Sequence, residues 1–205
     1  MKYMFLHGLG QDSFSWQEVL REFGKDEDAD CPDLFFLCKE DLSYQNLYSA
    51  FEKYCDRYKD TFSICGLSLG GILALDYTLK HSDRIKSLVL IGSQYRIPKK
   101  IMRFQNFVFR LLPNKTFQKM GLSKKEVLSL TESMINLDFE KKLRKIQCPV
   151  LILCGEKDYA NKKAAMELKS KISHAEYKEI LKTGHEVNKD NPKLLARVLE
   201  EFLGV

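Results

Sequence analysis

Short apolar runs alternate along the chain with longer stretches in which apolar residues recur at helical spacing. A run of roughly four to eight apolar residues is typical of a buried strand, whereas recurrence at the helical period is typical of an amphipathic helix. The runs that predict strands are Lys2–Leu6, Leu34–Cys38, Phe62–Cys65, Ile85–Ile91, Val150–Cys154 and Glu176–Leu181. Helices are predicted near 13–23, 44–58, 69–80, 162–172 and 191–203. This alternation implies right-handed crossovers, so we expect an α/β fold with a mostly parallel six-stranded sheet flanked by helices.

The pattern changes between residues 96 and 145, where no strand is predicted. Over 97–112, apolar and basic residues are interspersed at helical spacing, which predicts an amphipathic helix that Pro113 ends. A Ser-x-x-Glu capping box opens a second predicted helix over 123–137. A short third helix is predicted over 139–146. The middle of the chain is therefore expected to be helical throughout.

Basic residues are concentrated in the same part of the chain. The whole chain has a formal net charge of +5. Between Gln94 and Gln147, 13 Lys and Arg face 4 Asp and Glu, a balance of +9, and the remainder has 20 against 24, a balance of −4. Such a segment could contact acidic ligands or an anionic surface, although a solvated basic face without a partner is the commoner explanation. No nucleic-acid-binding motif accompanies it, so we expect no nucleic-acid partner.

The 205 residues suit one domain with room for a sizeable core. No apolar run approaches the length of a membrane span, and no signal peptide precedes the first predicted strand. The six cysteines form no Cys-x-x-Cys pair, and Cys38, Cys65 and Cys154 fall in predicted strands. These observations predict a reduced, cytoplasmic protein without a disulfide framework or a metal cluster.

The stretch Gly66-Leu67-Ser68-Leu69-Gly70 lies between a predicted strand and the apolar helix that follows it, and fits the pattern Gly-x-Ser-x-Gly. A strand that turns directly into a helix strains the backbone at the turn. Glycines two residues before and two residues after the turn remove side chains that would collide. We therefore expect the Ser68 hydroxyl to stand above the carboxyl edge of the sheet, where a base can reach it.

Three other positions also follow predicted strands, namely Leu9, Asp158 and His185. Ligands of parallel sheets bind beyond the carboxyl ends of the strands. These three residues and Ser68 are far apart in sequence, but this rule places all four on the same rim of the sheet.

A nucleophilic serine needs a base, and the base needs an acid that orients it. Only His185 lies in a loop directly after a strand that comes late in the chain. The other histidines are His7 in the first glycine loop, His81 at a helix end and His174 in a polar turn. Asp158 is the candidate acid, and Glu156 is the alternative two residues earlier.

These motifs closely resemble those of the α/β-hydrolase family. His7-Gly8-Leu9-Gly10 is similar to the family's oxyanion loop, Gly66–Gly70 to its nucleophile elbow, Gly155–Asp158 to its acid loop and Gly184-His185 to its histidine loop. The chain order Ser, Asp, His is the family order. The resemblance implies a core of residues 1–95 and 146–205, with a helical cap inserted at 96–145. By this resemblance, the first predicted strand of the chain corresponds to the family's third strand, which implies a minimal six-stranded sheet.

The resemblance also implies the role of each residue. Ser68 would be the nucleophile, His185 the general acid and base, and Asp158 its orienting partner. The backbone N–H groups of Leu9 and Leu69 would form the oxyanion hole. The supporting loop residues are His7, Gly8, Gly10, Gly66 and Gly70, with His7 bracing the oxyanion loop through a hydrogen bond. No cofactor or metal is implied.

A serine at position 68 argues against the dehalogenase and epoxide hydrolase branches, which resemble this fold but use an aspartate. The expected reaction is transfer of a small or medium acyl group from an ester or thioester to water, through an acyl-enzyme. A lysophospholipase, a monoacylglycerol lipase or a carbon–carbon bond hydrolase would use the same triad. A non-catalytic ligand receptor is the alternative from a different class.

The expected cap would select the small-molecule substrate. Its apolar residues Phe104, Phe107, Val108, Phe109, Leu111 and Leu112 could line an acyl pocket, or could merely pack the cap onto the sheet. Its basic residues Lys99, Lys100, Arg103 and Arg110 could attract an acidic head group or a lipid surface.

Overall fold

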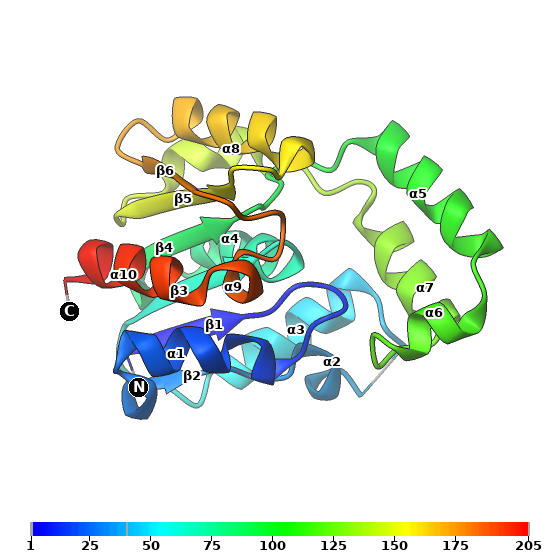
Figure 1. Cartoon of the computed structure of the whole chain (residues 1–205), viewed down its shortest axis with the longest axis horizontal. Helices are drawn as coiled ribbons and strands as arrows, with labels where there is room; N and C mark the ends of the chain where they lie inside the picture. The colour runs from blue at the N-terminus through cyan, green and yellow to red at the C-terminus, as the bar shows by residue number, and fades with distance from the viewer. Residues whose placement is uncertain (1, 40, 205) are drawn as a thin grey trace.

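Six parallel strands form one sheet at the centre of the molecule (Figure 1). The computed structural model describes residues 2–39 and 41–204, so the expected core limits at 1 and 205 lie outside the described residues. The strands are β1 (Tyr3–Leu6), β2 (Ala29–Asp30), β3 (Phe62–Leu67), β4 (Ile85–Ile91), β5 (Val150–Gly155) and β6 (Glu176–Ile180), in the spatial order β2-β1-β3-β4-β5-β6. Every neighbouring pair is parallel. The expected six-stranded α/β fold is confirmed, and the polar β6 lies at an edge.

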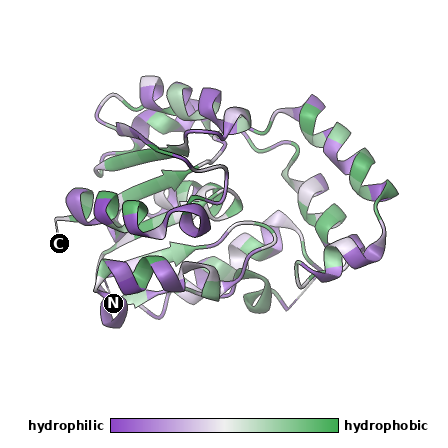
Figure 2. Cartoon of the chain, in the orientation of Figure 1, coloured by the Kyte–Doolittle hydropathy of each residue, from purple (hydrophilic) through white to green (hydrophobic). Residues whose placement is uncertain are grey.

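Helices cover both faces of this sheet. One face carries α1 (Gln17–Phe23) and α10 (Pro192–Leu203), and the other carries α3 (Tyr44–Cys55), α4 (Leu69–Lys80) and α8 (Tyr159–Lys171). Successive strand residues point to opposite faces, so β1 places Met4 and Leu6 in one core and Tyr3 and Phe5 in the other. Because both faces are covered, the central strands are predominantly apolar (Figure 2). The polar exceptions are Ser63 in β3 and Lys86 and Ser87 in β4.

The predicted strand Leu34–Cys38 is wrong. Leu34–Leu37 form the short helix α2, Cys38 follows its end, and the second strand is the two-residue β2, where no strand was predicted. The Asp33 carboxylate accepts hydrogen bonds from the N–H groups of Phe35 and Phe36, each at 3.2 Å, and so caps this helix. A short apolar run does not distinguish a strand from a helix, and here the cap before it decided the outcome.

Between β4 and β5 the chain is helical, as expected. It forms α5 (Lys99–Leu111), α6 (Asn114–Gln118), α7 (Lys124–Met134) and a 3₁₀ helix at Glu140–Lys145. The predicted capping box of α7 is present, because the Ser123 hydroxyl accepts from the Glu126 N–H at 3.2 Å and the Glu126 carboxylate accepts from the Ser123 N–H at 2.7 Å. Helix α6 was not predicted. Within the described residues, no helix has both the length and the apolar character that a membrane span requires.

Two adjacent segments connect the inserted helices to the core: residues 95–97 before α5 and residues 137–139 after α7. We call this pair of segments the neck. The Phe139 N–H donates to the Tyr95 carbonyl at 2.9 Å, and the Ile97 N–H donates to the Leu137 carbonyl at 3.0 Å. Helix α7 contacts both α3 and α5, and α5 lies at the outer edge of the molecule (Figure 1). The neck therefore anchors a helical layer beside the carboxyl ends of the strands.

Two further differences from the sequence prediction lie near the end of the chain. Helix α8 begins at Tyr159, three residues before the predicted start at Lys162. A short helix, α9 (Val187–Asp190), follows His185 and was not predicted. Helix α8 begins directly after Asp158 and α9 begins two residues after His185, so their first turns help to fix the loops that carry those residues.

We expect Gly66→Ala to destabilise the fold, because the backbone of Gly70 and Gly71 occupies the space that a Cβ atom at position 66 would need. Overpacking of this kind costs roughly 1–3 kcal/mol in free energy of unfolding. Gly8→Ala is the matched control, because its Cβ atom would meet nothing closer than 3.5 Å. Urea unfolding measures both variants, and equal unfolding free energies would contradict the packing argument.

Candidate active site

Ser68 occupies a strained turn between β3 and α4. Its backbone angles are φ 54° and ψ −113°, in the region that a residue with a side chain rarely adopts. The turn is held in place because the Ser68 N–H donates to the carbonyl of Ile91 on β4, at 2.8 Å. Gly66 and Gly70 are needed because β3, α4 and the end of β1 approach one another here too closely for side chains. The Ser68 side chain is half-buried.

His185 and Asp158 are joined by a hydrogen bond of 2.7 Å between the His185 Nδ1 and the Asp158 Oδ2. Asp158 follows β5 and is buried, whereas His185 lies in the loop after β6 and is partly exposed. Burial by itself would raise the pKa of the Asp158 carboxyl. The hydrogen bonds from His185 and Asn161 and the charge of the His185 ring outweigh burial, so this pKa lies below its ordinary value. Asp158 is therefore an ionised carboxylate that accepts a hydrogen bond from the His185 Nδ1–H.

Asn161 and Gln94 support this pair and were not identified from the sequence. The Asn161 Nδ2 lies 2.9 and 3.0 Å from the two carboxylate oxygens of Asp158 and 3.1 Å from the His185 Nδ1. The Gln94 Nε2 donates to the Asn161 Oδ1 at 2.8 Å, which orients the amide so that its NH₂ group faces Asp158. No sequence motif indicates either residue, because each reaches the site from a different element.

Gly92 is a further residue of the site that the sequence did not single out. It follows β4 with φ 53°, and a Cβ atom there would lie 3.0 Å from the Asp158 Oδ2 and 3.0 Å from the His185 Nδ1. Only glycine therefore allows β4 to pass so close to the pair. In the sequence, the only indication of this role was that Gly92 directly follows a predicted strand.

The first glycine loop lies against the Ser68 turn, with the position of a Gly8 Cβ atom 3.5 Å from the Ser68 Cβ. The N–H groups of Leu9 and Leu69 donate to no other described residue. His7 is fully buried and bridges the loop to α2, because its Nε2 accepts from the Leu34 N–H at 3.0 Å. Its Nδ1 donates to the Gly8 carbonyl at 3.0 Å. Burial lowers the His7 pKa and outweighs the opposite effect of this hydrogen bond, so the ring is neutral.

Gln11 connects the first glycine loop to the His185 loop and was also not predicted. Its Nε2 donates to the Glu186 carboxylate at 2.8 Å and to the Asn188 Oδ1 at 3.2 Å. Its Oε1 accepts from the Gly8 N–H at 3.3 Å. The two loops are thus held together by a buried amide rather than by their own backbones.

The alternative residues considered from the sequence lie elsewhere. His81 ends α4, where its Nε2 is 2.7 Å from the Glu52 carboxylate and its ring stacks on Tyr77. The His174 Nε2 is bonded to the Cys148 carbonyl at 2.9 Å. The Glu156 carboxylate accepts from the Lys182 N–H at 2.7 Å. None of these contacts involves Ser68.

A cavity of about 320 Å³ opens over Ser68 and His185. Leu9, Leu69 and Ile72 line its floor from the core, with Gln94 and Asn161 at one side. The inserted helices contribute Ile97, Pro98, Ile101, Met102, Gln105, Leu130, Thr131 and Met134. The cavity is thus enclosed jointly by the core and the helical segment.

Of the two roles considered for the six apolar residues of 104–112, lining an acyl pocket is not the one observed, because none of the six lines this cavity. Phe109 and Leu112 pack against the core instead. Phe104, Phe107 and Leu111 point outward and are exposed. The pocket instead receives Ile101, Met102 and Gln105 from α5. The sequence gives the period of the helix, but its rotation about its own axis depends on how it packs against α7.

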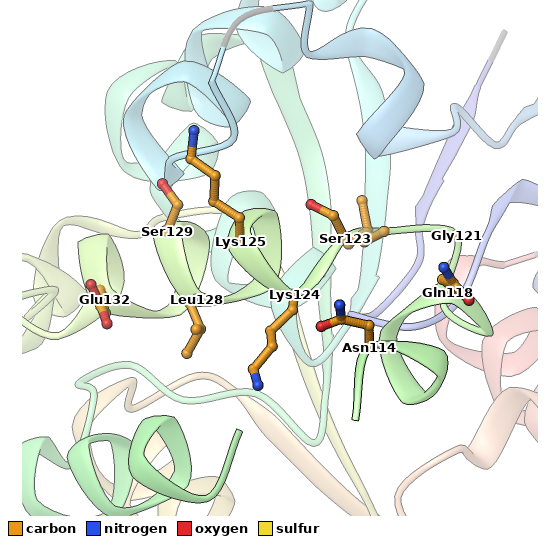
Figure 3. A pocket seen from close by; sticks show the side chains of 10 residues that line it. Asn114, Gln118, Gly121, Ser123, Lys124, Lys125, Leu128, Ser129 and Glu132 are labelled. Carbon is orange, nitrogen blue, oxygen red and sulfur yellow. The ribbon is translucent and has the colours of Figure 1, made fainter. Parts of the chain in front are cut away.

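A second, larger hollow of about 960 Å³ lies between α6 and α7 (Figure 3). The polar residues in its lining include Asn114, Gln118, Lys125, Ser129 and Glu132. It contains neither Ser68 nor His185. Within the described residues, no cluster of three or more His, Cys, Asp or Glu side chains could hold a metal ion.

Known proteins share this architecture. The chain is similar to a thermophilic esterase from Thermogutta terrifontis, with a TM-score of 0.82, 18% identity, and 100% of this chain and 89% of that chain covered. It is similar to the enol-lactonase from Burkholderia xenovorans LB400, with a TM-score of 0.82, 18% identity, and coverage of 100% and 92%. At such identities the likeness establishes the fold.

A relative and a family profile extend this likeness to the sequence. The chain is 30% identical over 134 residues to a protein of Arabidopsis thaliana named Probable lysophospholipase BODYGUARD 1. That match covers 58% of this chain and 28% of the relative, so the chain spans less than a third of that protein's length. The profile of the Alpha/beta hydrolase family matches residues 4–198. The chain therefore belongs to the alpha/beta hydrolase family, and the expectation that it is a hydrolase is confirmed at that level.

Proposed function

We propose that this chain hydrolyses carboxylic esters or thioesters with a small or medium acyl group, through an acyl-enzyme on Ser68. The observation that carries the proposal is the 2.7 Å hydrogen bond between His185 and Asp158 in the wall of a cavity that also contains Ser68. A base oriented by a carboxylate beside a strained serine is the arrangement that nucleophilic catalysis requires.

The proton transfers follow from the tautomer of His185. Because its Nδ1–H donates to Asp158, the Nε2 carries a lone pair and can accept the Ser68 proton as the hydroxyl oxygen attacks the acyl carbon. The imidazolium then gives this proton to the leaving alcohol or thiol. A water molecule next loses a proton to the Nε2 and attacks the acyl carbon. The bond between the Ser68 oxygen and that carbon then breaks, the Nε2 returns the proton to the Ser68 oxygen, and the acid is released. The Ser68 hydroxyl bonds to no described residue, so its contact with the Nε2 is expected to form with bound substrate.

The oxyanion of the tetrahedral intermediate needs preorganised donors. We assign this role to the N–H groups of Leu9 and Leu69, whose residues both line the cavity beside Ser68. Leu69 is the first residue of α4, where the N–H has no partner within the helix. One such donor is typically worth roughly 3–4 kcal/mol of barrier.

Asn161 is a positioning residue in this proposal. It contacts both oxygens of Asp158, so it fixes the carboxylate that in turn fixes His185. Gln94 fixes the orientation of Asn161. Hydrogen bonds of this kind favour the charged form of the carboxyl and keep its pKa low.

The size of the cavity supports a modest acyl group. A volume of about 320 Å³ lies at the lower end of the range of ligand pockets, roughly 300–1,000 Å³. The esterase and the lactonase that share the fold are named for ester chemistry. A lysophospholipase or monoacylglycerol lipase is the second candidate, supported by the name of the plant relative and by the apolar wall that α5 contributes.

A fluorophosphonate probe tests for the activated serine. Wild-type protein should become covalently labelled, Ser68→Ala should not, and His185→Ala should label far more slowly because the serine loses its base. Gel fluorescence measures labelling, and circular dichroism checks that each variant is folded. A folded wild type that does not react would favour a non-catalytic receptor.

Asn161→Ala should raise the pKa of the Asp158 carboxyl, because two hydrogen bonds to the carboxylate are lost. Carbon-13 NMR of labelled aspartate follows the titration, with Asp158→Asn identifying the signal. In the wild type the lowered pKa contributes stability at neutral pH that is lost as the pH falls below the ordinary carboxyl value. Asn161→Ala should lessen this loss, whereas the exposed control Asn114→Ala should change neither quantity.

Met102→Trp should shorten the preferred acyl chain, because Met102 is a half-buried wall residue whose enlargement reduces the cavity. Each excluded methylene should cost about tenfold in kcat/KM. A series of p-nitrophenyl esters of increasing acyl length measures the preference. Met166→Trp on the outside of α8 is the control. An unchanged length profile in Met102→Trp would place the acyl chain elsewhere.

A further inference from the structure

The outward face of α5 is apolar although it is in contact with solvent. Ile101, Phe104, Phe107 and Leu111 are exposed by 64%, 69%, 56% and 71%. They are four of the nine large apolar side chains that are exposed in the described part of the chain, and all four lie within one helix of 13 residues. A cluster of this kind on a soluble chain marks an interaction surface, whereas scattered single residues need no explanation.

The exposed residues form a single stripe. Positions 101, 104, 107 and 111 follow the three- and four-residue spacing that places side chains on one side of a helix. The opposite side packs inward, where Asn106 is buried and the Phe109 ring meets the Phe117 ring at 5.7 Å. Figure 2 shows the resulting mixture of apolar and polar positions on a helix that stands at the outer edge of the molecule. Among residues 2–39 and 41–204, none covers this stripe.

Positive charge accompanies the stripe. Helix α5 contains four basic residues and no acidic residue. Arg110 pairs with Glu132 at 2.5 Å, but within residues 2–39 and 41–204 no carboxylate forms an ion pair with Lys100 or Arg103. These two exposed cations could therefore bind an anion from outside the chain. The exposed apolar side chains beside them could pack against an apolar partner.

This combination distinguishes between possible partners. An isologous contact with a second copy would bring two such helices together and oppose their positive charges. An anionic bilayer instead offers phosphates for the cations and an acyl boundary for the apolar stripe, and it suits a single convex helix rather than a groove.

We propose that α5 is a docking helix for an anionic lipid surface. Phe104, Phe107 and Leu111 enter the boundary between head groups and acyl chains, while Lys100 and Arg103 contact the phosphates. Ile101 belongs both to the exposed stripe and to the wall of the cavity that contains Ser68. Docking would thus place the mouth of that cavity at the lipid surface, although binding itself does not depend on the proposed hydrolysis.

Flotation with lipid vesicles tests this inference. Ser68→Ala is the starting protein, so that hydrolysis cannot alter the vesicles and a failure of the proposed function cannot affect the result. It should bind phosphatidylcholine vesicles containing about one third phosphatidylglycerol, should bind pure phosphatidylcholine vesicles far less, and should be released by salt.

Two pairs of added substitutions separate the apolar and the charged contributions. Phe104→Asp with Leu111→Asp should weaken binding about tenfold or more, because two apolar anchors are lost. Lys100→Glu with Arg103→Glu should also weaken it about tenfold or more. The control for the first pair is Met166→Asp on α8, and the control for the second is Lys53→Glu with Lys59→Glu, which makes the same change in net charge.

Three outcomes would overturn the inference. The first is no binding of the folded protein to the anionic vesicles at low salt. The second is equal loss in the α5 variants and their controls, which would indicate attraction by net charge alone. The third is a concentration-dependent dimer, detected by light scattering, that Phe104→Asp with Leu111→Asp abolishes, because α5 would then serve contact between copies.

Discussion

The close approach of backbones around Ser68 is the constraint on which the rest of the site depends. Strand β3 turns into α4 without an intervening loop, and the turn leaves no space for side chains at Gly66 or Gly70. The same crowding extends to Gly92, which directly follows the neighbouring strand β4 and lies against the His185 and Asp158 pair. Ser68 can keep its strained backbone only because buried strands and a buried helix hold it on both sides.

Polar contacts then join loops that the parallel sheet brings to one edge. Gln11 links the first glycine loop to the His185 loop, and Asn161 links α8 to Asp158 and His185. Amide side chains suit this role because each both donates and accepts, so their orientation is set by the network. The site is therefore organised by three layers of support: a rigid sheet, crowded glycines and buried amides.

The inserted helices serve two faces of the molecule at once. Their inner side closes the cavity over Ser68, and the outer side of α5 carries apolar and basic residues into solvent. The amphipathic pattern of α5 therefore does not show which of its residues face the core, because exposed apolar residues contribute to that pattern. A soluble helix normally buries its apolar stripe, and here part of the stripe is left at the surface.

The sequence by itself determined five of the six strands, the order of the main elements and the positions of Ser68, Asp158 and His185 after strand ends. Strand periodicity and glycine spacing are local signals, and strand ends meet on one rim. It did not determine α2, whose four residues carry no period and whose cap lies outside the run. The tertiary structure alone decided that Gln94, Asn161 and Gln11 complete the site, since each acts on a distant loop. The tertiary structure also decided which side of α5 faces the cavity. A helical sequence pattern fixes only the angles between residues of the same helix. The rotation of the helix about its axis is set by the elements against which it packs.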